Sequence, residues 1–105
     1  MSTTLELFAH AKGTVVATVL TANVKVFCQL TRVALGQYRV TVNSGRGAAA
    51  GDVKATINAL GAAARTVNFQ AVSETVFDVF TYDAAGAAQD VTDLWVTLER
   101  VPRVQ

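Results

Sequence analysis

The residues that could do chemistry are few, and their types and spacing form no catalytic or metal-binding pattern. The chain has one histidine, His10, and one cysteine, Cys28. Because a structural zinc site takes about four such ligands, we expect His10 to be a solvent-facing or hydrogen-bonded side chain. We expect Cys28 to be a small buried residue. None of the serines stands in the Gly-x-Ser-x-Gly setting of a hydrolase nucleophile.

The acidic residues offer one further possibility, a calcium site. Asp83, Asp90 and Asp93 flank a single loop, and Ca²⁺ takes several oxygen ligands. Their spacing, however, matches no known calcium-binding loop. The glycine-rich segment 45–51 lacks the spacing and the Lys-Ser/Thr pair of a phosphate-binding loop. The sequence therefore predicts a protein that is not an enzyme, with no cofactor and no metal ion.

Composition bounds the class of protein and its partners. The 105 residues are enough for one domain, residues 1–105, in which 1–4 and 102–105 are expected to be flexible ends. Charged residues make up only 16% of the chain and the net charge is +1. We therefore expect neither nucleic acid nor a membrane as a partner. The sparse charge suits a subunit packed against neighbouring subunits. The sequence starts without the pattern of a signal peptide, so synthesis in the cytoplasm is the default expectation.

Alternation of apolar and polar residues predicts the elements that would carry any site. It recurs with a period of two, whereas helical periodicity is absent. The expected strands are 5–10, 13–20, 24–31, 37–42, 52–58, 66–71, 76–82 and 94–99. Glycine-containing turns separate them, and Ala-rich 47–51 and 61–64 are expected to form a short helical turn at most. The predicted fold is all-β, an antiparallel sandwich or jelly-roll-like single domain of about eight short strands.

The same alternation predicts which side chains share a face of each strand. Cys28 is expected to share a face with Val24, Val26 and Leu30. Residues 76–82 and 94–99 read as strand, tight turn, strand, with Asp83 and Gly86 forming the turn. Both faces of 76–82 are apolar, which predicts a second covering layer or a subunit contact. Phe80, Tyr82 and Trp95 are therefore the candidate residues for contact with a subunit or partner.

The order of strands and turns resembles the small all-β virion modules of tailed bacteriophages. The segments that carry the resemblance are Gly36-Gln37-Tyr38-Arg39-Val40-Thr41-Val42, residues 77–90 from Phe77-Asp78-Val79 onward, and Leu94-Trp95-Val96-Thr97-Leu98-Glu99-Arg100. Such modules include head cement or decoration proteins and the distal domains of tail fibres. They share a Gly-x-Tyr-x-Val-x-Val strand, a Phe-x-Val-x-Thr-Tyr-Asp-x-x-Gly hairpin and a final hydrophobic strand.

The resemblance implies a non-enzymatic structural protein of the virion, made in the host cytoplasm. The preferred expectation is a capsid cement or decoration subunit, a homotrimer that binds the major capsid protein and stabilises the phage head. The alternative is a receptor- or glycan-binding module at a tail-fibre tip. Under that alternative, Trp95, Tyr82 and Asp93 would line one exposed groove.

Overall fold

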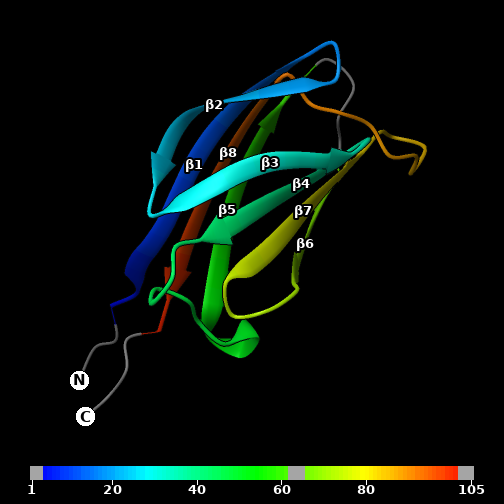
Figure 1. Cartoon of the computed structure of the whole chain (residues 1–105). Helices are drawn as coiled ribbons and strands as arrows, with labels where there is room; N and C mark the ends of the chain where they lie inside the picture. The colour runs from blue at the N-terminus through cyan, green and yellow to red at the C-terminus, as the bar shows by residue number, and fades with distance from the viewer. Residues whose placement is uncertain (1–3, 62–65, 102–105) are drawn as a thin grey trace.

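Eight antiparallel strands form two four-stranded sheets in the computed structural model, which describes residues 4–61 and 66–101. The strands are β1 (Glu6–Val16), β2 (Val19–Val26), β3 (Cys28–Ala34), β4 (Gln37–Val42), β5 (Val53–Leu60), β6 (Thr66–Ala71), β7 (Val76–Tyr82) and β8 (Asp93–Arg100). The first sheet has the order β2-β1-β8-β5, and the second sheet has the order β3-β4-β7-β6. The two sheets pack as layers of a sandwich (Figure 1), which confirms the predicted fold class.

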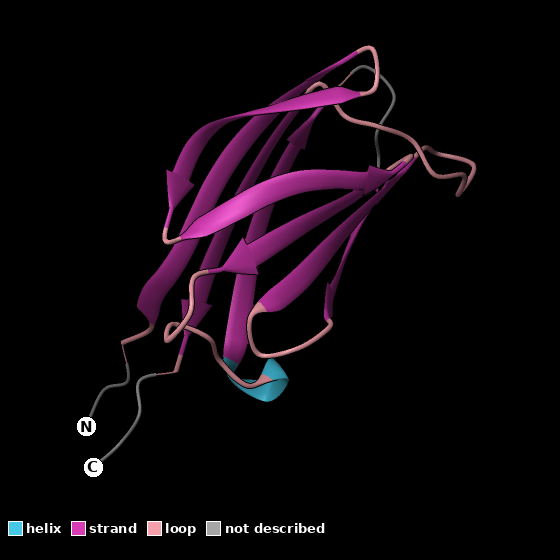
Figure 2. Ribbon diagram, in the orientation of Figure 1, coloured by secondary structure: helices cyan, strands magenta, loops and turns pink. Residues whose placement is uncertain are grey.

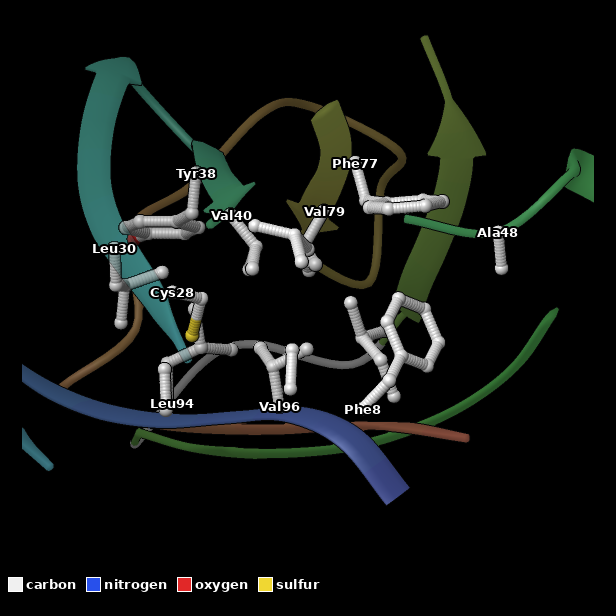
Figure 3. Packing of buried hydrophobic residues seen from close by; sticks show 14 of the residues in the cluster. Phe8, Cys28, Leu30, Tyr38, Val40, Ala48, Phe77, Val79, Leu94 and Val96 are labelled. Carbon is white, nitrogen blue, oxygen red and sulfur yellow. The ribbon is translucent and has the colours of Figure 1, made fainter. Parts of the chain in front are cut away.

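The core lies between the two layers, where the alternating apolar residues of the central strands meet. Figure 3 shows these side chains pointing toward one another from the two sheets. Phe8 of the first sheet meets Phe77 of the second edge to face, with ring centroids 5.9 Å apart. The inward residues of β4 and β8 are almost completely buried, as the alternation predicts: Tyr38, Val40, Val42, Leu94, Val96 and Leu98. Cys28 is also buried, which confirms the expectation for its thiol.

The sandwich has two different ends. At the basal end, Glu6 of β1 pairs with Arg100 of β8, so the described chain enters and leaves the fold there. The short 3-10 helix Ala50–Asp52 lies at this end and appears at the bottom of Figure 2. It is the helical turn expected in the first Ala-rich segment. At the distal end lie the β1–β2 and β3–β4 turns and the loop 83–92, whereas most of the second Ala-rich segment lies outside the described residues.

The first strands differ from the prediction because β1 runs straight through Lys12-Gly13, where a glycine-containing turn was expected, opposite a bulge at Asn23 on β2. The β1–β2 register shifts there, and Gly13 is buried against Leu20 and Leu30. The chain instead reverses at Ala17 and Thr18, whose φ angles are 49° and 66°. Positive φ at both central residues gives a turn whose twist suits a two-residue hairpin. Alanine and threonine give no signal of positive φ in the sequence, so this turn could not be predicted from residue type.

The predicted strand 24–31 is wrong, because the chain changes sheets in its middle. Phe27 adopts a positive φ of 61° between β2 and β3. Cys28 and Leu30 consequently point into the core, while Val24 pairs with Lys12 beyond the bulge, on the outer side of the first sheet. The expected common face of Val24, Val26, Cys28 and Leu30 therefore does not exist.

The segment 76–99 is not a hairpin either. β7 belongs to the second sheet and β8 to the first, so the connection 83–92 crosses from one layer to the other. Its turn is as predicted: Gly86 has a φ of 87° and donates its N–H to the Asp83 carbonyl at 3.1 Å. The Asp83 carboxylate also accepts the N–H groups of Ala85 and Ala87. The expected flexible ends, 1–4 and 102–105, lie outside the described residues apart from Thr4.

Candidate functional site

A carboxylate in the crossing loop joins three separate partners among the described residues. Asp90 accepts hydrogen bonds from the Tyr38 hydroxyl and the Gly36 N–H, both at 2.8 Å. It also pairs with the Arg32 guanidinium, with an N–O distance of 2.9 Å. The Tyr38 hydroxyl accepts the buried N–H of Val91 at 3.0 Å. This cluster fastens the loop 83–92 across the distal end of the second sheet.

The ionisation of Asp90 and Tyr38 follows from these contacts. Burial disfavours the charged form of Asp90, but the hydrogen bonds from Arg32, Gly36 and Tyr38 outweigh it and lower its pKa. Burial, together with the neighbouring Asp90, raises the pKa of Tyr38 to about 12. The carboxylate is therefore charged and fully engaged at neutral pH, which is the arrangement of a structural clamp. A general base would need a free lone pair facing a cleft.

The structure does not gather the three acids that suggested calcium. Asp83 binds the backbone of its own turn, Asp90 binds Arg32 and Tyr38, and Asp93 accepts the Thr14 hydroxyl at 3.1 Å on the first sheet. Across the part of the chain that is described, no group of three or more His, Cys, Asp or Glu side chains is placed to hold a metal ion.

Another carboxylate, that of Asp78, is buried on the outer face of the second sheet. Asp78 is only 2% exposed although no further layer covers it. Arg39 on β4 closes over it with two hydrogen bonds of 2.8 and 3.0 Å, and Gln37 adds a third at 3.1 Å. The Arg39 hydrogen bonds are the main cause that lowers the pKa of Asp78, against the opposing effect of burial. Nothing in the sequence pattern signals this pair, because cross-strand register decides it.

The three candidate contact residues are part-exposed, and they occupy opposite sides of the sandwich. Phe80 and Tyr82 lie two residues apart on β7, on the outer face of the second sheet. Trp95 lies on the outer face of the first sheet, because its neighbours Leu94 and Val96 point into the core. Asp93 shares the face of Trp95, whereas Tyr82 does not. The groove proposed for a glycan therefore cannot contain Trp95, Tyr82 and Asp93 together.

Trp95 has a polar and cationic surrounding on the central strands of the first sheet. The His10 ring lies 5.4 Å from its ring, centroid to centroid, at an angle of 34°. Lys12 Nζ lies 5.2 Å from the Trp95 ring, within the range of a cation–π contact. His10 Nδ1 is 2.9 Å from the Thr97 hydroxyl, so this histidine is hydrogen-bonded as expected. The cluster of His10, Lys12, Trp95 and Thr97 is called the Trp95 patch below.

A cleft of about 500 Å³ opens at the basal end. Its lining residues are Gly45, Gly47, Glu74, Thr75 and Arg100. Arg100 is already engaged there: Nε donates to Glu6 at 2.9 Å, and Nη1 donates to the carbonyls of Arg46 and Gly47. The guanidinium therefore ties β8 to the loop 43–49 and is not directed at a ligand.

Comparison of the chain with protein-family models, with curated proteins and with solved structures finds no match. Within the described ranges, no helix is long and apolar enough to cross a membrane. The fold defines the class as a two-sheet antiparallel β-sandwich. Among the described residues, the hydrogen bonds of Asp78 and Asp90 join strands and loop, and Phe80, Tyr82 and Trp95 are part-exposed.

Proposed function

We propose that this protein is a non-enzymatic structural subunit of a tailed-phage virion, a cement or decoration subunit that binds the major capsid protein and stabilises the head. The observation that carries the proposal is the placement of Phe80, Tyr82 and Trp95, part-exposed on the outer faces of both sheets. Aromatic residues are enriched at protein–protein interfaces because they bury a large area with little loss of conformational freedom.

Exposed aliphatic residues on the same molecule support this choice. Val16 and Val19, which pair beside the first turn, are 68% and 64% exposed. Leu35 at the β3–β4 turn is 55% exposed, and Leu60 at the end of β5 is 51% exposed. All four lie at the distal end. A subunit that contacts several capsid proteins at once would bind through the sum of such modest contacts, since linked sites multiply their affinities.

The test is binding to purified phage heads that lack decoration. The protein should sediment with the heads at a saturable stoichiometry and raise the temperature at which they release DNA. Val16→Ser together with Val19→Ser should weaken binding, because it removes exposed apolar area without touching the core. Thr21→Ser, on the neighbouring exposed face of β2, is the matched control. Failure to bind any tailed-phage head would refute the proposal.

The second candidate function is recognition of a glycan at a tail-fibre tip. The Trp95 patch favours it, because sugars stack on part-exposed aromatic rings beside hydrogen-bonding side chains. Titration with oligosaccharides should then quench Trp95 fluorescence, and Thr97→Val should weaken that effect. If no glycan on an array binds the protein and the protein binds phage heads, the decoration role would be the one remaining candidate.

A further inference from the structure

The outer face of the second sheet carries two aromatic rings surrounded by amide and hydroxyl groups. Phe80 and Tyr82 lie two residues apart on β7, which separates them by roughly 7 Å along the strand. Gln37 of β4 and Asn68 of β6 lie opposite Phe80, one on each side. Thr66 of β6 lies opposite Tyr82. Side chains directly opposite on neighbouring strands start about 5 Å apart, so each ring has a hydrogen-bonding group beside it.

A hollow of about 380 Å³ continues this row at the distal end. Its lining residues are Thr66, Tyr82, Asp83, Ala84, Ala85 and Gly86. Tyr82 therefore belongs both to the aromatic row and to the hollow, whose volume lies in the range of small-molecule sites. Asp83 binds the N–H groups of its turn through Oδ1 alone. The turn does not require Oδ2, which is left as an acceptor at the hollow.

The charges of this face are paired with each other. Of the outward residues on the four described strands, only Arg39 and Asp78 are charged, and they form one ion pair. Gln37 Nε2 donates to Asp78 at 3.1 Å, which leaves the Gln37 carbonyl oxygen as an acceptor. Arg39 uses Nε and Nη2 on Asp78, which leaves Nη1 as a donor. Both groups are held in place before any ligand binds, and this lowers the entropy lost on binding.

We propose that this face binds a neutral oligosaccharide along β7, with one sugar ring stacked on Phe80 and a terminal ring in the hollow beside Tyr82. A sugar ring has C–H groups on its faces, which pack on an aromatic ring, and hydroxyl groups at its edge, which both donate and accept hydrogen bonds. The amides of Gln37 and Asn68 supply both functions. The closed ion pair and the Asp83 carboxylate favour an uncharged sugar over an acidic one.

The sheet geometry also separates a sugar from a peptide ligand. β4 and β7 are paired on both sides, so a ligand on this face meets side chains and not unpaired backbone groups. Addition of a peptide strand requires a free sheet edge. Such a sugar site goes beyond the proposed function, because a subunit can carry it whether or not it binds a phage head.

The test begins with an array of neutral and acidic glycans, and the neutral glycan bound most tightly is then titrated by calorimetry against the purified full chain. Trp95, the one tryptophan, reports on the opposite face of the sandwich. Its fluorescence should stay unchanged as the glycan binds. Quenching of Trp95 would overturn the proposal in favour of the Trp95 patch. Binding of acidic glycans alone, or of no glycan, would also overturn it.

Substitutions then locate the site on the second sheet. Phe80→Ala and Tyr82→Ala should each lower the affinity about tenfold through the loss of stacking, whereas Tyr82→Phe keeps the ring and should retain most of it. Asn68→Ala should lower the affinity about threefold. Gln29→Ala, an exposed amide on the same face but on β3, is the matched control and should change nothing. Circular dichroism checks that each variant is folded.

Equal losses from Asn68→Ala and Gln29→Ala would overturn the placement along β7. Sedimentation with phage heads, run with and without the glycan, separates this site from the proposed function. Head binding without glycan binding would overturn only the sugar site. Glycan binding without head binding would refute only the decoration role.

Discussion

Tyr38→Phe removes a single oxygen atom from the centre of the Asp90 cluster. The hydroxyl is 0% exposed as part of the Tyr38 side chain, accepts the Val91 N–H at 3.0 Å and donates to Asp90 at 2.8 Å. Its loss leaves a buried N–H without an acceptor, which costs about 1–3 kcal/mol. Asp90 keeps its hydrogen bonds from Arg32 and from the Gly36 N–H, so the loss of the Tyr38 donor lowers the free energy of unfolding little further. We expect the free energy of unfolding to fall by about 2 kcal/mol.

For a domain of this size, about 2 kcal/mol corresponds to a fall of roughly 10 °C in the melting temperature. Thermal unfolding followed by circular dichroism measures this directly, and urea titration gives the free energy independently. Tyr82→Phe is the matched control: its ring is part-exposed on the outer face of the second sheet, so we expect a change within about 0.5 kcal/mol. Equal effects of the two substitutions would refute the view that Tyr38 fastens the crossing loop.

Three further predictions concern acid stability, backbone strain and the thiol. The lowered pKa of Asp78 contributes stability that is present above the unfolded pKa of about 4 and is lost as the pH falls through the folded pKa. Asp78→Asn should therefore make the free energy of unfolding depend less on pH in the acid range. Gly36→Ala should destabilise strongly, since φ is +67° and the new Cβ would lie 2.6 Å from the Thr81 carbonyl oxygen, whereas Gly45→Ala, with nothing within 4 Å, should cost only about 1 kcal/mol. Cys28 should resist a thiol reagent in the folded protein and react at once in denaturant, because burial raises its pKa; rapid labelling of the native state would contradict this.

The alternation of residue types was sufficient to predict five of the strands, from β4 to β8, and which of their side chains point inward. None of these five strands contains a bulge of its own, so the period of two runs unbroken through each of them. Prediction failed at Gly13, which lies inside β1 opposite a bulge on β2, and at the positive-φ residues Ala17, Thr18 and Phe27. Positive φ at such residues comes from the surrounding tertiary structure and has no local signal.

For the candidate contact residues, too, the sequence predicted the local direction of the side chains but not their arrangement in the folded molecule. The outward direction of Phe80, Tyr82 and Trp95 followed from alternation within single strands. Their distribution over opposite sides of the molecule did not, because it depends on β7 and β8 belonging to different sheets. The Asp78–Arg39 and Asp90–Tyr38 pairs join residues 39 and 52 positions apart, and only the folded register brings them together.

The pairing of β1 with β8 has a consequence for how the chain acquires its fold. These two strands form the middle of the first sheet, yet His10 and Thr97 are 87 positions apart in sequence. A contact between residues so far apart in sequence forms only after a large loop has closed. The entropy lost on closure comes before the favourable free energy of the contact, which slows folding to milliseconds or seconds. On the ribosome, the β1–β2, β3–β4 and β6–β7 pairs can form early, whereas the β1–β8 pair must wait until β8 has been synthesised. We therefore expect the first sheet to be completed last.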